Sequence, residues 1–206
     1  MCLVIHKPRD ARVPEALLES AARFNPDGFG IMWLDASRGI DLRRRSRTRV
    51  SELIRLYRER QAFECVLHLR YRTRGSVDLE NTQPMRITND IYMVHNGTVD
   101  VRLRKDGRSD TWHLVEDYLR PILRRRPEVL YDSAFERLIR AWAGAHNRFV
   151  FMDARRSTTV VVNRESGIAW GDLWLSNERW FDATRFDGLL ERPLGNETAR
   201  DLTFLT

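Results

Sequence analysis

The second residue of the chain, Cys2, is the first candidate for chemistry. A cysteine is a strong nucleophile only as a thiolate, so its sulfur needs a nearby base or a lowered pKa. If Met1 is removed, the base can be the α-amine of Cys2 itself, whose pKa in model compounds is about 8. A small second residue such as Cys permits that removal. The position is compatible with nucleophilic attack by a terminal cysteine, but a cysteine at position 2 is by itself a weak signal.

Further motifs follow Cys2 in a fixed order. They are NPDGFGI at 25–31, HLRYRTRG at 68–75, NTQP at 81–84, HNG at 95–97 and SDT at 109–111. Together with Cys2 they resemble the class II glutamine amidotransferases, which are glutaminase domains with an N-terminal nucleophile. The resemblance covers roughly residues 2–115 and continues more loosely to WLSNE at 174–178. Each motif alone is unspecific, whereas the ordered set is specific.

The resemblance implies two residues that hold the charged ends of glutamine. Arg70 matches the arginine that grips the α-carboxylate through its planar fork. Asp110 matches the aspartate that binds the α-ammonium group. From the residues alone, Arg70 also fits a surface arginine on a strand, and Asp110 fits a helix N-terminus. Thr73 is expected to support the substrate through its hydroxyl or backbone.

The resemblance also implies an oxyanion hole at Asn96 and Gly97. Attack on the amide carbon puts negative charge on the former carbonyl oxygen, which the Asn96 side-chain NH₂ and the Gly97 backbone N–H would meet. Taken alone, an Asn-Gly pair more often forms a hairpin turn. His68 and His95 are not expected to act as bases, because the family's base is the N-terminal amine.

Two positions depart from the family pattern. Arg72 stands where most members have a small residue, and Gln83 stands where most have a histidine. Arg72 follows Arg70 closely and could alter what is bound, while Gln83 could affect packing of the loop. Neither change removes a catalytic element. Cys65 fits a small buried apolar residue.

The elements that must position these residues follow from hydrophobic periodicity and turn signals. Predicted strands lie at 2–6, 29–33, 65–71, 91–94, 149–152 and 159–162. Predicted helices lie at 14–24, 51–61 and 133–143, and another begins at Ser109-Asp110 and is kinked or ended by Pro121. Residues 43–49 read as a basic connector, 167–180 as a Gly/Trp-rich stretch, and the tail to Thr206 has no clear pattern.

The mixture of strands and helices suggests sheets covered by helices. The resemblance makes this an α+β fold of four layers, α-β-β-α, in which two antiparallel sheets pack between helices as in N-terminal-nucleophile hydrolases. The 206 residues suit one domain spanning 1–206. The resemblance requires no metal and no organic cofactor.

Composition excludes several classes of protein. No apolar run approaches the ~18 residues of a membrane span. The apolar run after Met1 is also too short for a secretory signal, so a cytoplasmic location is expected. The two cysteines do not indicate a disulfide framework. The sequence contains no C-x-x-C, so a zinc site built on paired cysteines is not indicated either. The net charge of +6 permits nucleic-acid binding but does not establish it.

Three readings of function remain open at this stage. The first is a stand-alone glutaminase whose ammonia passes to a separate ammonia-accepting synthetase subunit, an expectation drawn from chain length. The second is an N-terminal-nucleophile hydrolase of a different amide. The third is a non-catalytic binding module on the same fold, with the arginine-rich segments 43–49 and 120–126 meeting nucleic acid or an acidic protein. Such segments are usually solvated faces, so nucleic acid is not the favoured partner.

Overall fold

The computed structural model of the chain describes residues 2–178 and residue 180. The strands are β1 (Leu3–Lys7), β2 (Phe29–Asp35), β3 (Gly39–Arg45), β4 (Glu64–Leu69), β5 (Met85–Arg86), β6 (Ile91–Asn96), β7 (Arg148–Asp153), β8 (Thr158–Val162), β9 (Ile168–Trp170) and β10 (Leu173–Leu175). The α-helices are α1 (Glu15–Phe24), α2 (Val50–Arg58), α3 (Asp110–Leu114), α4 (Arg120–Arg125) and α5 (Ser133–Ala143). A π-helical segment spans Val115–Leu119, and 3₁₀ turns span Pro127–Tyr131 and Arg164–Ser166.

The larger sheet has the strand order β3-β2-β4-β1-β10-β9 and is antiparallel throughout. In β1 and β4, Leu3 lies opposite Leu69. Successive residues of a strand face opposite sides of the sheet. Leu3 and Ile5 therefore pack on one side and Val4 on the other, each in an apolar cluster. Burial on both faces explains why these strands are continuous apolar runs in the sequence.

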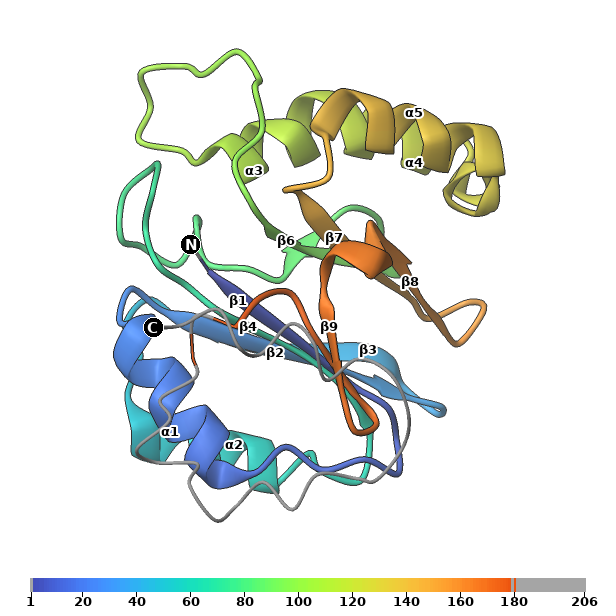
Figure 1. Cartoon of the computed structure of the whole chain (residues 1–206). Helices are drawn as coiled ribbons and strands as arrows, with labels where there is room; N and C mark the ends of the chain where they lie inside the picture. The colour runs from blue at the N-terminus through green and yellow to red at the C-terminus, as the bar shows by residue number, and fades with distance from the viewer. Residues whose placement is uncertain (1, 179, 181–206) are drawn as a thin grey trace.

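The smaller sheet has the order β5-β6-β7-β8 and is also antiparallel. In Figure 1, α1 and α2 cover the outer face of the larger sheet, and α3, α4 and α5 lie over the outer face of the smaller one. The predicted α+β fold with two antiparallel sheets between helices is confirmed. Within the described residues, no helix combines the length and apolar character that crossing a bilayer would require.

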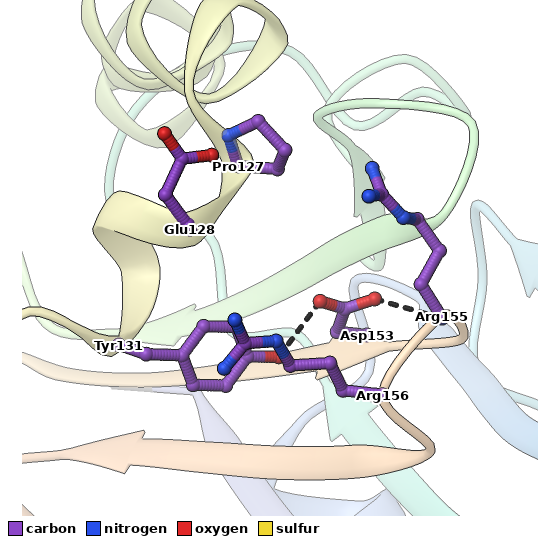
Figure 2. Close-up of a pocket in the computed structure, with 6 residues that line it drawn as sticks. All are labelled: Pro127, Glu128, Tyr131, Asp153, Arg155 and Arg156. Carbon is purple, nitrogen blue, oxygen red and sulfur yellow. Dashed lines mark hydrogen bonds between the residues drawn. The ribbon is translucent and has the colours of Figure 1, made fainter.

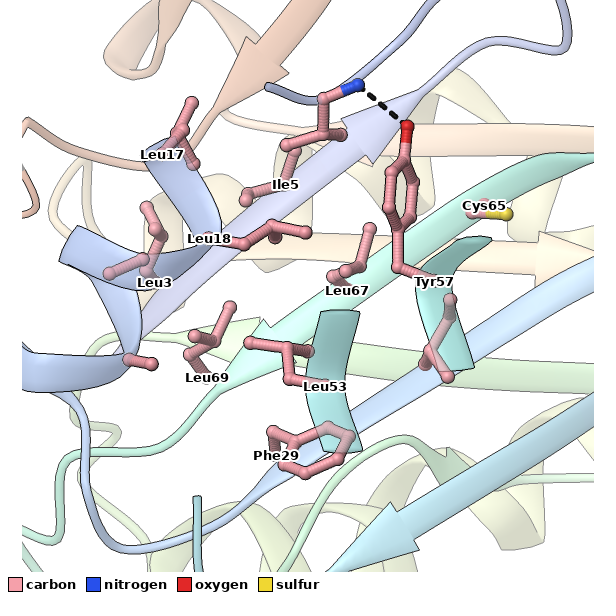
Figure 3. Packing of buried hydrophobic residues seen from close by; sticks show 14 of the residues in the cluster. Leu3, Ile5, Leu17, Leu18, Phe29, Leu53, Tyr57, Cys65, Leu67 and Leu69 are labelled. Carbon is pink, nitrogen blue, oxygen red and sulfur yellow. Dashed lines mark hydrogen bonds between the residues drawn. The ribbon is translucent and has the colours of Figure 1, made fainter. Parts of the chain in front are cut away.

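Three apolar clusters fill the spaces between the four layers. In the first, Leu17 and Leu18 of α1 and Leu53 of α2 pack against the larger sheet (Figure 3). The second, between the smaller sheet and its helices, includes Met93, Leu114, Val115, Leu119, Phe149 and Phe151. The third, between the two sheets, consists of Val4, Met32, Leu34, Val66, Val94, Val150, Met152 and Trp174. Full burial of one such side chain stabilises the fold by about 1.5–3 kcal/mol.

Some predicted elements were wrong. Arg43–Arg45 is the end of strand β3 rather than part of a connector, because β3 pairs along its whole length with β2. The stretch 167–180 contains strands β9 and β10, of which β10 pairs with β1. Helix α2 spans Val50–Arg58, so it begins one residue before the predicted helix 51–61 and ends three residues earlier.

The helical run that starts at Asp110 does not end at Pro121. The run passes from α3 through the π-helical segment into α4, where Pro121 stands in the first turn. Proline supplies no backbone N–H, and the π-helical segment directly before α4 changes the hydrogen-bond pattern at this point of the run. Helix α5 has the predicted bounds. The unpatterned tail falls at 181–206, outside the described residues.

Candidate active site around Cys2

One pocket is lined by five of the six residues that the resemblance singles out, namely Cys2, Arg70, Thr73, Gly97 and Asp110. It holds about 300 Å³ of empty space, part of it open to solvent. The other lining residues are Tyr71, Arg74, Asn81, Gln83, His95, Ser109 and Thr111. The sixth residue, Asn96, donates from its side-chain amide to the Cys2 carbonyl oxygen at 2.6 Å.

Cys2 lies immediately before β1, with its sulfur 3.5 Å from the Tyr71 carbonyl oxygen. Burial raises the pKa of the thiol, and the nearby Arg70 guanidinium opposes that rise. A thiol whose pKa is raised is mostly protonated near neutral pH. The sulfur at this position therefore needs a base before it can attack an amide.

Asn96 ends strand β6, and Gly97 follows it with a φ of +147°. A Cβ at Gly97 would lie 2.1 Å from Asn147 Oδ1, so only glycine fits between the strand end and this side chain. The Asn96 amide carries two N–H groups, of which the Cys2 carbonyl uses one. A second donor remains for another acceptor.

Arg70 follows β4 and is 4% exposed. Its guanidinium donates to the Ser76 carbonyl at 2.9 Å and to the Arg74 carbonyl at 3.2 Å. These bonds hold the guanidinium rigidly against the loop 71–83. A guanidinium has five N–H donors, so donors remain for a carboxylate in the pocket.

Asp110 is the first residue of α3, and Ser109 caps the helix by accepting a hydrogen bond from the Trp112 backbone N–H at 3.2 Å. The helix start predicted at Ser109-Asp110 is confirmed, and Ser109 rather than Asp110 is the N-cap residue. Asp110 Oδ2 accepts from the Val99 N–H at 2.9 Å, and the residue is 3% exposed. Its remaining oxygen and lone pairs can accept from a cationic ligand group.

His95 lines the pocket, but its ring is held within the protein. Nδ1 lies 2.9 Å from Thr111 Oγ1 and Nε2 lies 2.8 Å from Asn147 Oδ1, while the ring stacks on Phe149. Burial lowers the pKa of His95, which favours the neutral ring. His68 is completely buried, and burial lowers its pKa to about 3. Both rings are neutral packing groups in this arrangement.

Gln83 is buried and pairs with the backbone of β6. Its Oε1 accepts from the His95 N–H at 2.5 Å, and its Nε2 donates to the His95 carbonyl at 3.3 Å. The Gln83 side-chain amide thus pairs with the His95 backbone in the way a neighbouring strand would. Arg72 is exposed and does not line the pocket, whereas Arg74 does.

Sequence reasoning missed two asparagines that support the site. Asn81 donates to the Gly107 carbonyl at 2.9 Å and accepts from the Ser109 N–H at 2.7 Å, which joins the loop 71–83 to the start of α3. Asn177 donates to the Cys2 carbonyl at 2.8 Å. Both belong to motifs that were recognised, NTQP and WLSNE, but no role had been attached to either residue.

A second pocket lies away from Cys2, between the 3₁₀ turn Pro127–Tyr131 and the β7–β8 turn (Figure 2). Tyr131 donates its hydroxyl to Asp153 at 2.7 Å, and the Arg156 guanidinium lies 3.9 Å from the centre of the Tyr131 ring. Glu128 and Arg155 complete its charged lining. It contains no nucleophile. In the described part of the chain, no group of His, Cys, Asp and Glu side chains could hold a metal ion.

The family model for class II glutamine amidotransferases matches residues 17–143. This range contains Arg70, Asn96, Gly97 and Asp110, and Cys2 precedes it. None of the curated proteins matches the chain.

Several solved structures are similar to the chain, among them the following three. Glutamine phosphoribosylpyrophosphate amidotransferase from B. subtilis, complexed with ADP and GMP, is 14% identical with a TM-score of 0.47, covering 90% of this chain and 42% of that one. The allosteric regulatory enzyme of purine biosynthesis is 16% identical with a TM-score of 0.48, and the match covers 90% of this chain and 42% of that one. A glutamine aminotransferase class-II domain protein from Silicibacter pomeroyi is 18% identical with a TM-score of 0.38, over 75% and 73%. The chain thus spans less than half the length of the first two.

Proposed function

The chain belongs to the class II glutamine amidotransferases, and on that premise we propose that it hydrolyses the side-chain amide of glutamine with Cys2 as N-terminal nucleophile. The observation that carries the proposal is the shared pocket. It joins a cysteine to a buried guanidinium at Arg70 and a buried carboxylate at Asp110. A cation and an anion on one small pocket complement the carboxylate and ammonium of a free amino acid.

Binding follows from these charges. Arg70 pairs with the α-carboxylate through donors that its loop carbonyls leave unused, and Asp110 accepts from the α-ammonium group. Thr73 contributes to the pocket wall. With both charged ends fixed, the side-chain amide of glutamine extends toward Cys2. A bound geometry of this kind makes the attack effectively intramolecular.

The chemistry needs the free amine of Cys2. The amine takes the thiol proton, and the thiolate attacks the amide carbon to form a tetrahedral intermediate. The Asn96 amide and the Gly97 N–H stabilise the oxyanion, a contribution of about 10²–10³ in rate per donor. The protonated amine then gives its proton to the departing ammonia, which leaves a γ-glutamyl thioester. Water hydrolyses the thioester to glutamate and regenerates the thiol.

The test combines intact mass with ammonia release. Protein whose mass equals the chain without Met1 is expected to release ammonia from glutamine, and Cys2→Ala is expected to abolish the release. Asparagine, one methylene shorter, is expected to be a poor substrate because its amide falls short of the sulfur. Protein without Met1 that leaves glutamine untouched would overturn the proposal. Release from another γ-glutamyl or acyl amide would then favour a hydrolase of that amide.

We further propose that the ammonia passes to a separate synthetase subunit. Tyr71, Val77, Leu79 and Leu103 are exposed apolar side chains on the loops 71–83 and 97–109, which border the pocket. The loops are joined by the Ser76 N–H, which donates to the Gly107 carbonyl at 2.8 Å. Exposed apolar side chains beside a site that releases ammonia suit a partner that consumes it. An ammonia-using synthetase that binds the wild type and Leu79→Asp equally would contradict this surface.

A further inference from the structure

Asn177 lies beside Cys2 because β10 pairs with β1. After β10 ends at Leu175, Ser176 continues the pairing: its N–H donates to the Val4 carbonyl at 2.9 Å, and its Oγ accepts from the Val4 N–H at 2.9 Å. Ser176 is completely buried, so these two hydrogen bonds to Val4 are shielded from water. The next residue is thereby directed at the start of β1, where Cys2 stands.

The Asn177 amide contacts both Cys2 and Asn96. Its Nδ2 donates to the Cys2 carbonyl at 2.8 Å and lies 3.2 Å from Asn96 Oδ1 and 3.2 Å from Ser176 Oγ. Asn96 in turn donates from Nδ2 to the same Cys2 carbonyl at 2.6 Å. The two amides and one carbonyl therefore form a closed triangle directly behind the nucleophile.

The triangle determines which end of the Asn96 amide is the donor. An amide carries an acceptor oxygen and a donor NH₂ group, and a flip exchanges them. Because the Asn177 NH₂ meets the Asn96 oxygen, the flipped orientation would set two NH₂ groups against each other. It would also set the Asn96 oxygen against the Cys2 carbonyl oxygen. Asn177 thus favours the orientation in which Asn96 offers N–H donors.

We propose that Asn177 is a positioning residue for amide hydrolysis: it locks the Asn96 side chain with its NH₂ group toward the reacting oxygen and fixes the Cys2 carbonyl. The inference rests on the proposed function, in which Asn96 stabilises the oxyanion. Asn177 does not line the pocket and needs no contact with substrate. Its effect falls on the transition state, because the ground-state contacts to glutamine belong to Arg70 and Asp110.

The test compares Asn177→Ala with the isosteric Asn177→Asp. Both remove the NH₂ group, but Asp keeps the shape, so a packing role would be retained in Asp and a donor role would not. Both are expected to lower kcat for ammonia release by about 10-fold or more with KM nearly unchanged, the pattern of an interaction made only in the transition state. The rate of Cys2 alkylation by iodoacetamide is expected to stay within about 2-fold, because that displacement forms no oxyanion.

Ser20→Ala is the matched control. The Ser20 hydroxyl donates to the Trp180 carbonyl at 2.5 Å, so its loss loosens the segment that follows Asn177 without touching Asn96 or Cys2. This variant is expected to keep wild-type kcat. Retained kcat in Asn177→Asp, or an equal loss in Ser20→Ala, would overturn the positioning role while leaving glutamine hydrolysis by the wild type intact. A wild type without glutaminase activity would overturn the proposed function and this inference together.

Discussion

Replacing Asp110 by Asn tests how the pocket recognises its substrate. The change is isosteric, and the side-chain oxygen of Asn can still accept from the Val99 N–H, now 2.9 Å from Asp110 Oδ2. Asn is also tolerated near a helix start, where the Ser109 cap remains. The fold is therefore expected to survive, and the change removes the negative charge that is proposed to bind the α-ammonium group.

The magnitude follows from the burial of Asp110, which is 3% exposed. Little solvent screens this carboxylate, so a hydrogen bond from an ammonium group to it contributes about 1.5–3 kcal/mol. At about 1.4 kcal/mol per tenfold, KM for glutamine is expected to rise by roughly 10- to 100-fold. The kcat is expected to change little, because the ammonium group is bound equally in the ground state and the transition state.

The assay measures ammonia release against substrate concentration for the wild type and Asp110→Asn. Glutaramate, which is glutamine without its α-amino group, is the matched substrate control. The two proteins are expected to treat glutaramate alike, since neither can use the missing contact. An unchanged KM for glutamine in Asp110→Asn, with the melting temperature preserved, would refute the assignment of Asp110 to the ammonium group.

Two further predictions concern Gly97 and His68. Gly97→Ala is expected to lower kcat by at least about 10²-fold and the melting temperature by several degrees, because φ is +147° and the new Cβ would meet Asn147 Oδ1 at 2.1 Å. Gly171→Ala is the control, because Gly171 has a φ of +55° and open space around it. Both variants are compared with the wild type by kcat and melting temperature. Equal losses in Gly97→Ala and Gly171→Ala would contradict the role of close packing at Gly97. His68 has a folded-state pKa of about 3, below the ordinary value of about 6.5, so the unfolded chain binds the proton first as the pH falls. The contribution of neutral His68 to the free energy of unfolding is complete above about pH 6.5 and decreases by about 2 kcal/mol at pH 5. Denaturant titrations above about pH 6.5 and at pH 5 should therefore show that the wild type loses about 2 kcal/mol more than His68→Phe. Equal losses in the two proteins would contradict this prediction.

Helices with strong local signals could be predicted from sequence. Helix α5 has the predicted bounds because Asp132 caps it, accepting from the Ala134 N–H at 2.7 Å, and Gly144 ends it with a φ of +74°. Ser109 carries an equally local cap signal at the start of α3. These contacts join residues close in sequence, so a short stretch of sequence is enough to predict where these helices begin and end.

Strands stabilised by distant partners could not be predicted in the same way. Residues Arg43–Arg45 have no apolar alternation. They form a strand because β3 pairs along its whole length with β2. Strand β10 is short and pairs with β1, more than 160 residues earlier in the chain, as in Ile5↔Leu175. No window of local sequence contains such a pairing.

The candidate site shows the same division. Family motifs are enough to propose roles for Cys2, Arg70, Asn96, Gly97 and Asp110, because the chemistry of each motif is explicit. The WLSNE motif does not indicate the role of Asn177, because the bond from Asn177 to the Cys2 carbonyl joins residues 175 positions apart. Residues that orient other residues are specified by the fold rather than by local pattern.

The spacing between the proposed nucleophile Cys2 and the proposed oxyanion donor Asn96 depends on how the two sheets pack. Cys2 precedes β1 in one sheet and Asn96 ends β6 in the other, and a hydrogen bond of 2.6 Å joins them. Val4 and Val94 stand two positions along each strand, on the same faces as Cys2 and Asn96, and both belong to the cluster between the sheets. The interface that buries these valines therefore also sets the distance between Cys2 and Asn96. Helices α1 and α2 contribute to the apolar cluster on the other face of the larger sheet, so changes in their buried side chains should affect stability before they affect the chemistry.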